Sequence, residues 1–276
     1  MGEVRVGTCA WSDHEGLYPP GLAPGLRLFH YAQQFDLVEA DVSFYRPITA
    51  AMTARWVRST PSGFIFDLKA PGPVTGHRPA DQEQRAGALE AFVAALEPIL
   101  TAGRLGAVLL QFPPWTTDTA ATRDAIETLV RGFRGLRLAV EFRHASWFSG
   151  SPRRTLDWLE GQGLVHVVAD EPQVGQGCVP RVEAVTCREL SIMRLHGRNA
   201  ATWYGRHATS GERFRYRYSR EEIGELVEVA RRLARQATEV HLLFNNNYGN
   251  YAVEGARAAL LALGRPPGGT LFPDER

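Results

Sequence analysis

The sequence predicts an α/β fold, a single (β/α)8 barrel of the TIM type, and three observations support this. Short apolar segments alternate with helical segments along almost the whole chain, and eight of them have the character of strands. A length of 276 residues suits such a barrel as one domain. The alternative, an open doubly wound sheet, typically carries a glycine-rich phosphate-binding motif after its first strand, and none stands there.

The expected strands are short, apolar and bounded by turn residues. In chain order they are residues 4–10, 38–42, 63–69, 107–112, 136–140, 165–169, 191–196 and 239–244. The expected helices lie between them, at residues 26–35, 50–58, 81–101, 118–133, 152–161, 219–235 and 251–263. Pro113 and Pro114 stop the fourth strand, Asp118 caps the helix that follows, and Gly135 ends that helix.

No internal repeat or interdomain linker interrupts this alternation, so we expect one domain over residues 1–276. Its core covers about residues 4–263, and residues 264–276 form a tail. About twenty irregular residues follow the sixth strand. A longer polar and aromatic insertion follows the seventh strand and runs to Tyr218.

Composition excludes several classes of protein. With 44% hydrophobic and 22% charged residues, the chain can bury a large core and is not intrinsically disordered. A net charge of +1 gives no overall field toward nucleic acid or membranes. The three cysteines (Cys9, Cys178 and Cys187) show no C-x-x-C spacing, and no apolar run is long enough to cross a membrane. The chain begins directly with a strand and no signal peptide, so we expect a cytoplasmic protein.

The segment 136–147 first indicates a functional site. Side chains alternate between the two faces of a strand, so Ala139, Glu141 and Arg143 point one way, and Val140 and Phe142 the other. A carboxylate and a guanidinium at the carboxyl end of a buried strand are an unusual way to build an apolar core. They are a common way to build a binding site.

Similar polar residues end most of the other strands, and in a parallel barrel these ends meet at one mouth. They are Glu39, Asp41, Asp67, Lys69, Gln111, Glu141, Arg143, Asp170, Arg194, His196 and Asn245. Burying an ion costs several kcal/mol unless it is paired or lines a cavity. So many charged groups at one depth favour a ligand site over a purely structural network.

Lys69 is the most informative of these residues, because 30 of the 31 basic residues are arginines and it is the only lysine. Arginine would serve equally well as a salt-bridge partner for Asp67 or Glu39, which is the alternative explanation. Lysine differs as a compact charge, as a group whose pKa falls on burial, and as an amine nucleophile. We therefore expect a catalytic or anion-binding role for it.

The predicted catalytic residues are Glu39, Lys69, Glu141 and His196, with His196 as a general base unless it is only a wall residue. The predicted substrate-binding residues are Trp11, Asp41, Tyr45, Gln111, Arg143, Asp170, Arg194, Asn199, Tyr204 and Asn245. Glu39, Glu141, Asp170 and His196 would suit a divalent metal. Their spacing is not local, however, and no H-E-x-x-H signature occurs, so we expect no metal and no nucleotide cofactor.

The insertion after the seventh strand mixes cations with aromatic rings, the combination that phosphate and base recognition requires. Its arginines are Arg198, Arg206, Arg213, Arg215, Arg217 and Arg220, and its aromatic residues are Trp203, Tyr204, Phe214, Tyr216 and Tyr218. A solvated loop in an arginine-rich protein would look the same. Trp11, Trp115 and Trp147 each follow a strand and could form a stacking platform or an apolar rim at the mouth.

Ordered motifs along residues 4–263 resemble the YecE-like family, a domain of unknown function. They are GTCAW at 7–11, VEADVSFYRP at 38–47, TPSGF at 60–64, FDLKA at 66–70, LQFPP at 110–114, AVEFRHASW at 139–147, RLHGRN at 194–199 and FNN at 244–246. The resemblance implies a TIM barrel. It also implies a looser similarity to the endonuclease-IV-like and xylose-isomerase-like barrels, whose histidine-rich metal set is not visible here. Cys9 stands where many relatives have serine.

Three hypotheses follow. The first is an enzyme acting on a small phosphorylated or carboxylated substrate. In it, Lys69, Arg143 and Arg194 hold the anion, and Glu141 or His196 moves a proton. The second is a barrel that binds or processes nucleic acid through residues 198–220. The third is a binding protein without catalytic activity.

Overall fold

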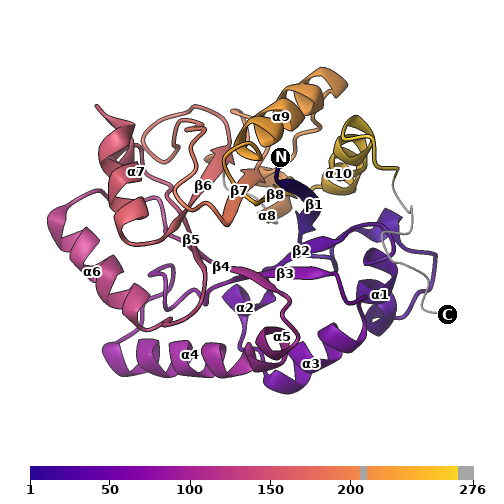
Figure 1. Ribbon diagram of the computed structural model, residues 1–276, viewed down its shortest axis with the longest axis horizontal. Helices are drawn as coiled ribbons and strands as arrows, with labels where there is room; N and C mark the ends of the chain where they lie inside the picture. Colours follow the sequence, from indigo (N-terminus) through magenta and orange to yellow (C-terminus); the bar gives the residue numbers. More distant parts are fainter. Residues whose placement is uncertain (206–209, 267–276) are drawn as a thin grey trace.

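The computed structural model describes residues 1–205 and 210–266, and it confirms the predicted barrel. All eight strands pair in parallel, each with its neighbours in the chain, and β8 closes the barrel against β1 (Figure 1). The strands are β1 (Glu3–Cys9), β2 (Leu37–Ala40), β3 (Ile65–Lys69), β4 (Leu105–Gln111), β5 (Leu138–Glu141), β6 (Val165–Asp170), β7 (Leu190–Leu195) and β8 (Glu239–Phe244).

Helices surround the barrel and cover its outer face (Figure 1). They are α1 (Arg27–Tyr31), α2 (Val42–Tyr45), α3 (Ala50–Arg58), α4 (Gln82–Ala95), α5 (Glu97–Thr101), α6 (Ala120–Arg131), α7 (Pro152–Gly161), α8 (Ser210–Arg213), α9 (Arg220–Leu233) and α10 (Tyr251–Ala262). Within the described ranges, none of these helices has the length and apolar character needed to cross a membrane. Residues 267–276 of the expected tail lie outside the described residues.

Three element boundaries differ from the predicted ones. The second strand ends at Ala40, because the chain turns into α2, whose Ser43 hydroxyl donates to the backbone oxygen of Lys69 (2.6 Å). The helix expected at 81–101 divides at Leu96, since Pro98 has no N–H to continue the helical hydrogen bonding. Thr119, not Asp118, caps α6, because the Asp118 carboxylate instead pairs with Arg123 (2.7 Å).

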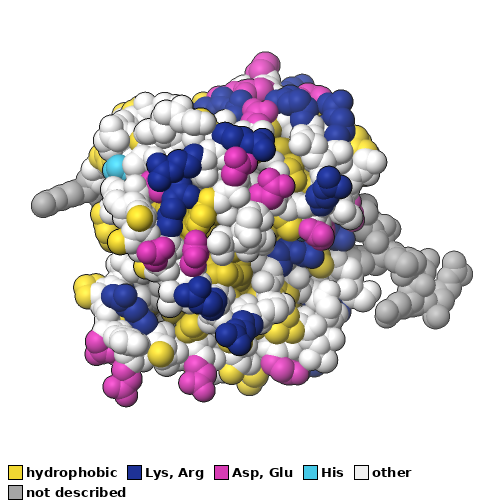
Figure 2. Space-filling model, turned by 60° about the vertical axis from the view of Figure 1, so that its left-hand side comes forward, with side chains coloured by type: hydrophobic (Ala, Val, Ile, Leu, Met, Phe, Trp, Pro, Cys, Tyr) yellow, Lys and Arg dark blue, Asp and Glu magenta, His cyan; other side chains and the backbone are white. Residues whose placement is uncertain are grey.

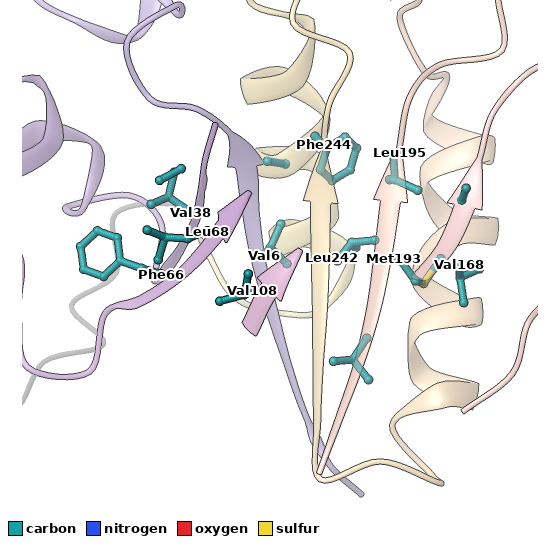
Figure 3. Packing of buried hydrophobic residues seen from close by; sticks show 14 of the residues in the cluster. Val6, Val38, Phe66, Leu68, Val108, Val168, Met193, Leu195, Leu242 and Phe244 are labelled. Carbon is teal, nitrogen blue, oxygen red and sulfur yellow. The ribbon is translucent and has the colours of Figure 1, made fainter. Parts of the chain in front are cut away.

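Two apolar layers hold the barrel together. The larger layer lies between the outer face of the sheet and the helices. It includes Val6, Val38, Phe66, Leu68, Val108, Val168, Met193, Leu195, Leu242 and Phe244 (Figure 3). The smaller layer fills the barrel interior and includes Cys9, Leu37, Ala107, Leu109, Ala139, Val165, Val167, Leu190, Ile192 and Leu243.

Asp67 belongs to the lower part of the barrel, which corrects its predicted place among the strand-end residues of the mouth. Its Oδ2 lies 2.7 Å from Nδ1 of His241, and its Oδ1 accepts a hydrogen bond from the backbone N–H of Ala107 (2.8 Å). His241 pairs in register with Ile192, two residues below Arg194. Asp67 therefore stabilises the barrel interior and does not line the mouth.

We predict that Gly106→Ala destabilises the protein, because the added methyl group overlaps the buried Asp67–His241 pair. A Cβ at residue 106 would overlap Oδ1 of Asp67 and lie 2.6 Å from Cε1 of His241. Overpacking of this kind costs about 1–3 kcal/mol, measurable by urea unfolding. The control is Gly224→Ala in α9, where no atom lies within 4 Å of the added Cβ and better helix propensity stabilises by up to about 1 kcal/mol. Equal stabilities of the two variants would contradict the prediction.

Candidate active site

A cavity of about 400 Å³ opens at the carboxyl ends of the strands. This is the face on which barrels of this type build their sites from strand ends and loops. Its lining consists of Ala10, Asp13, Asp41, Phe44, Tyr45, Lys69, His77, Gln111, Pro114, Trp115, Arg143, Gly177, Gly211, Arg213, Phe214, Asn245 and Asn247. The lining thus combines three cations, two carboxylates, several amides and several aromatic rings, a mixture suited to a polar ligand that carries a negative charge.

Arg194 lies beneath this cavity and joins two carboxylates. Its side chain is completely buried, and it donates to Oε1 of Glu39 (2.6 Å) and Oε2 of Glu141 (2.5 Å). Nη1 of Arg194, the atom that donates to Glu141, also lies 3.3 Å from Oε1 of Gln111, which lines the cavity. Arg194 therefore orients the two glutamates and does not reach the ligand space, although we predicted that it binds substrate.

Arg143 lies nearer the mouth than Arg194 and lines the cavity. It donates through Nε to Oε1 of Glu141 and through Nη1 to Oε2 of Glu171 (2.6 Å). Glu141 is thus held between the guanidiniums of Arg143 and Arg194. Charge-assisted bonds of this kind fix geometry strongly, so the upper guanidinium is presented to the cavity in one orientation.

His196 is completely buried beside this group. Its Nε2 lies 3.3 Å from Oε1 of Glu141 and 3.0 Å from Nη2 of Arg143, and its Nδ1 lies 2.8 Å from Nδ2 of Asn245. Burial and the Arg143 charge lower the pKa of His196 to about 3. The ring is therefore neutral near pH 7, a state in which it can accept a hydrogen bond but does not serve as an acid.

The two buried glutamates differ in their proton affinity. Burial raises the pKa of Glu39 well above its usual value, with Asp41 adding to the shift and Arg194 opposing it. Burial also acts to raise the pKa of Glu141, but Arg143, Arg194 and His196 together hold it well below its usual value. Neighbouring carboxyl groups with pKa values moved apart can divide the roles of acid and base between them.

Lys69 presents its ammonium to the cavity from the end of β3. Its Nζ lies 4.2 Å from the centre of the Phe44 ring, and it makes no hydrogen bond or ion pair with any residue the structure describes. Burial lowers the pKa of Lys69, with Asp41 opposing this effect and Arg194 adding to it. The ammonium thus contacts the Phe44 ring, and the rest of its exposed surface faces the cavity.

Of the fourteen predicted site residues, ten meet at this place. Those that line the cavity are Asp41, Tyr45, Lys69, Gln111, Arg143 and Asn245. Those that form the buried network beneath it are Glu39, Glu141, Arg194 and His196. Trp11 lies next to the cavity, in an adjoining hollow of about 300 Å³ that shares Ala10, Asp13, Asp41 and Tyr45 with it.

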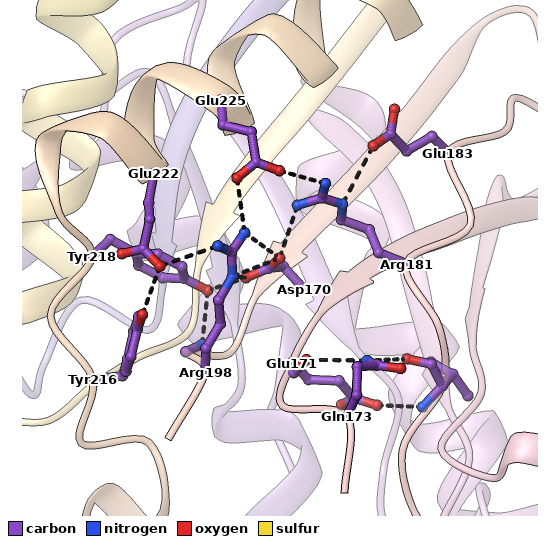
Figure 4. A network of polar contacts seen from close by, with 12 residues as sticks. Asp170, Glu171, Gln173, Arg181, Glu183, Arg198, Tyr216, Tyr218, Glu222 and Glu225 are labelled. Carbon is purple, nitrogen blue, oxygen red and sulfur yellow. Dashed lines mark hydrogen bonds and ion pairs between the residues drawn. The ribbon is translucent and has the colours of Figure 1, made fainter. Parts of the chain in front are cut away.

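Asp170 points away from the cavity, contrary to its predicted place. Its oxygens accept hydrogen bonds from Arg181 (3.1 Å), Arg198 (2.9 Å) and the Tyr218 hydroxyl (2.7 Å) (Figure 4). It pairs in register with Leu195, which packs on the outer side of the barrel. Asp170 therefore joins the loop after β6, which carries Arg181, to the segment after β7, which carries Arg198 and Tyr218.

Asn199 and Tyr204 are also absent from the cavity lining. The Asn199 amide donates to the backbone oxygen of Arg215 (2.8 Å), and its oxygen accepts from the N–H of Ala201 (3.1 Å). The Tyr204 hydroxyl bonds the backbone of Val174 and Gly177. Both side chains hold loops together, and a contact with a ligand stays a prediction for each.

Several site residues were not predicted. Glu171, His77, Phe44, Asp13 and Asn247 contact Arg143 or line the cavity. Burial raises the pKa of Glu171 to about 7, with Arg143 opposing this rise. Glu171 directly follows Asp170, so it occupies the opposite side of the chain at that strand end. Strand alternation could have identified it. Phe44 lies in the short helix α2, and Asp13, His77 and Asn247 stand on loops, where no periodicity gives their direction.

Most arginines of the insertion are engaged with other side chains. Arg198 binds Asp170, Arg217 pairs with Glu254 (2.6 Å), and Arg215 lies over the Tyr248 ring (4.8 Å). Arg213 is the one that lines the cavity, and Arg206 lies outside the described residues. Figure 2 shows one face of the molecule on which basic side chains are interspersed with acidic ones. Nucleic-acid binding by this segment stays a prediction.

Over residues 1–205 and 210–266, no three histidine, cysteine, aspartate or glutamate side chains are placed to hold a metal ion. Asp170, the fourth member of the conceivable ligand set, faces away from Glu39, Glu141 and His196.

Comparisons with known proteins identify the family but not its function. Residues 5–274 match the family model described as protein of unknown function DUF72. The UPF0759 protein YunF of Bacillus subtilis (strain 168) is 34% identical over 265 residues, which cover 93% of each protein. The resemblance of the motifs to the YecE-like family leads to the same family of unknown function.

Solved structures with the same fold agree with this. A DUF72 family protein of Enterococcus faecalis V583 superimposes with a TM-score of 0.88 at 28% identity, over 99% of both chains. One from Thermotoga maritima MSB8 gives a TM-score of 0.82 at 30% identity, over 95% of this chain and 100% of the other. The chain belongs to the DUF72 family of proteins of unknown function.

Proposed function

We propose that this protein is an enzyme that acts on a small phosphorylated or carboxylated substrate in the cavity at the mouth of the barrel. The observation that carries the proposal is the ammonium of Lys69, which faces the cavity without a hydrogen bond or ion pair to any described residue. A cavity of about 400 Å³ is within the usual size range for small-molecule sites.

The excess of three cations over two carboxylates in the lining supports an anionic substrate. Arg143 and Arg213 line it together with Lys69, and Nε of Arg213 is buried without a hydrogen-bond partner among the described residues. Arg143 shares the single carboxylate of Glu141 with Arg194. The raised pKa values of Glu39 and Glu171 favour their neutral forms, which reduces the negative charge of the buried network beneath the cavity. A phosphate or carboxylate group would supply the missing partner for these cations.

The buried network beneath the cavity supports proton transfer. Glu39 can hold a proton near pH 7 because burial raises its pKa, whereas Glu141 stays ionised and His196 stays neutral, so both can accept hydrogen bonds. Gln111 and Asn245 connect this network to the ligand space. These groups have the distribution expected for general acid–base catalysis, with amides to orient the substrate.

The proposal predicts that phosphate compounds stabilise the protein thermally, and that the cavity cations are responsible. Inorganic phosphate and a panel of phosphorylated and carboxylated metabolites are added during thermal unfolding. At a ligand concentration of 100 times Kd, binding to the native state adds about 2.7 kcal/mol of stability. Arg143→Met and Lys69→Met should lose most of the resulting rise in Tm.

The matched control is Arg153→Met, which removes an exposed arginine of α7 paired only with Asp157. It should keep the full rise in Tm. If no compound of the panel stabilises the wild type more than Lys69→Met, the proposed anion site is wrong. Short oligonucleotides in the same assay test the nucleic-acid alternative, for which affinity should fall steeply with salt concentration.

A further inference from the structure

Lys69 combines three properties that a simple anion-binding residue does not need. It is the only lysine in a chain that otherwise uses arginine for every cation. Its side chain is only 8% exposed, and what is exposed faces the cavity. Arginine binds phosphate or carboxylate with two parallel hydrogen bonds and would serve better for that purpose alone. An amine, unlike a guanidinium, can attack a carbonyl carbon.

We propose that Lys69 is a nucleophile that forms an imine with the carbonyl group of an anionic aldehyde or ketone. This inference rests on the proposed function and narrows its substrate class to phosphorylated or carboxylated carbonyl compounds. In it, Arg143 and Arg213 hold the anion, which leaves Lys69 free to react with the carbonyl carbon. The ring of Phe44 fixes the position of Nζ.

Asp41 is placed to move the protons of this reaction. It lines the same cavity, its Oδ1 is buried without a hydrogen-bond partner among the described residues, and it is the carboxylate that acts most strongly on Lys69. Burial already lowers the pKa of the amine, which increases the fraction of neutral amine available for attack. Asp41 and Lys69 line the same cavity without a direct ion pair, so a water molecule between them would carry the proton.

The reaction balances with these groups and a water molecule that relays protons between them. The ammonium gives a proton through this water to the Asp41 carboxylate, and the free amine attacks the carbonyl carbon, so a C–N bond forms as the C=O π bond opens. The alkoxide takes one of the two protons of the now positively charged nitrogen, which gives a neutral carbinolamine. Asp41 then returns its proton to the carbinolamine hydroxyl, which leaves as water while the nitrogen lone pair forms the C=N bond. The product is a protonated imine, with Asp41 again ionised and one water molecule released.

Borohydride reduction tests this directly, because it converts an imine into a stable secondary amine. The full-length protein is incubated with pyruvate, dihydroxyacetone phosphate or pyridoxal 5′-phosphate, then reduced, and the adduct is located by peptide mass mapping. Met1, which is 90% exposed, carries the other primary amine and serves as an internal reference. Because the cavity positions the carbonyl, we expect about tenfold more adduct at Lys69 than at Met1 for at least one compound. Excess inorganic phosphate should suppress only the adduct at Lys69.

Lys69→Arg separates this inference from the proposed function. It should lose the adduct but keep the rise in Tm with inorganic phosphate, and Lys69→Met should lose both. If inorganic phosphate stabilises the wild type but no compound labels Lys69 above Met1, the imine proposal is wrong and the anion site stands. If inorganic phosphate does not stabilise the protein and Lys69 is labelled no more in the folded than in the urea-unfolded chain, both proposals fail. Labelling of the wild type decides the question even if a variant does not fold.

Discussion

Replacing Arg194 with methionine should lower the free energy of unfolding by about 3–5 kcal/mol, the usual cost of removing one partner from a buried ion pair. Arg194 is completely buried and, among the residues the structure describes, is the one that bonds both Glu39 and Glu141. Without Arg194, the Glu141 carboxylate retains an ion pair with Arg143 alone. Glu39 loses the arginine to which it is hydrogen-bonded. Urea unfolding at pH 7, followed by circular dichroism, measures the loss.

Two comparisons make this expectation specific. Arg153→Met removes an exposed i,i+4 pair with Asp157 and should cost no more than about 0.5 kcal/mol. Adding Glu141→Gln to Arg194→Met should recover part of the stability, because the ionised carboxylate that lost one of its two arginines is then gone. Near-equal stabilities of Arg194→Met and the wild type would mean that the buried network does not hold the barrel interior together.

Alternation of strand and helix was sufficient to predict the architecture, because each segment repeats the same local pattern and a closed parallel barrel satisfies all of them. The boundaries were less predictable where a single contact decides them. Asp118 is a residue type that often caps helices, but its carboxylate forms an ion pair with Arg123. The side chain of Thr119 therefore makes the N-cap hydrogen bond of α6. The break at Leu96 follows from Pro98, a signal that was present in the sequence.

Strand-end position predicted most of the candidate site, and its errors arose from direction. Glu141 and Arg143 follow the alternation of β5, and both point where expected. Asp170 was one position out of phase, so Glu171 contacts Arg143 in its place. His77, Trp115 and Asn247 reach the cavity from loops, whose direction depends on contacts between distant segments rather than on a repeat.

The depth of each strand-end residue also depended on the barrel as a whole. Arg194 and Lys69 both end strands, yet Arg194 is enclosed and Lys69 meets the cavity. The stagger between neighbouring strands decides how far each strand end extends toward the mouth. This stagger depends on how the strands pair, so it cannot be derived from the residues of one strand. This is why Arg143 and Arg213 line the cavity and Arg194, predicted to bind the anion, does not.

The protein should be acid-labile, and His166→Gln should relieve part of this lability. His166 is buried on β6, with Nε2 2.9 Å from the backbone oxygen of Val182 and Nδ1 without a partner among the described residues. Protonation would place an N–H at Nδ1 with nothing to accept it. Burial accordingly lowers the pKa of His166 to about 4, with the bond to Val182 opposing this effect.

The sign of the pH effect follows from that pKa. The unfolded chain binds a proton at His166 below about pH 6.5, whereas the folded protein binds it only near pH 4. Stability from this residue is therefore complete above pH 6.5 and is lost as the pH falls toward 4, by about 2.5 kcal/mol at pH 4.5. His14 and His196 have pKa values lowered in the same direction and add to the lability.

Urea unfolding at pH 7 and pH 4.5 measures the difference. Between these two values, His166→Gln should lose about 2.5 kcal/mol less stability than the wild type, since glutamine can donate to Val182 but does not titrate. His241 provides the opposite case: burial lowers its pKa, but Asp67 and Glu239 outweigh this effect and raise it to about 9. Its contribution is complete below pH 6.5 and is lost as the pH rises through 9, so His241→Gln should change the alkaline and not the acid limb. An unchanged acid limb in His166→Gln would show that His166 is protonated in the folded protein.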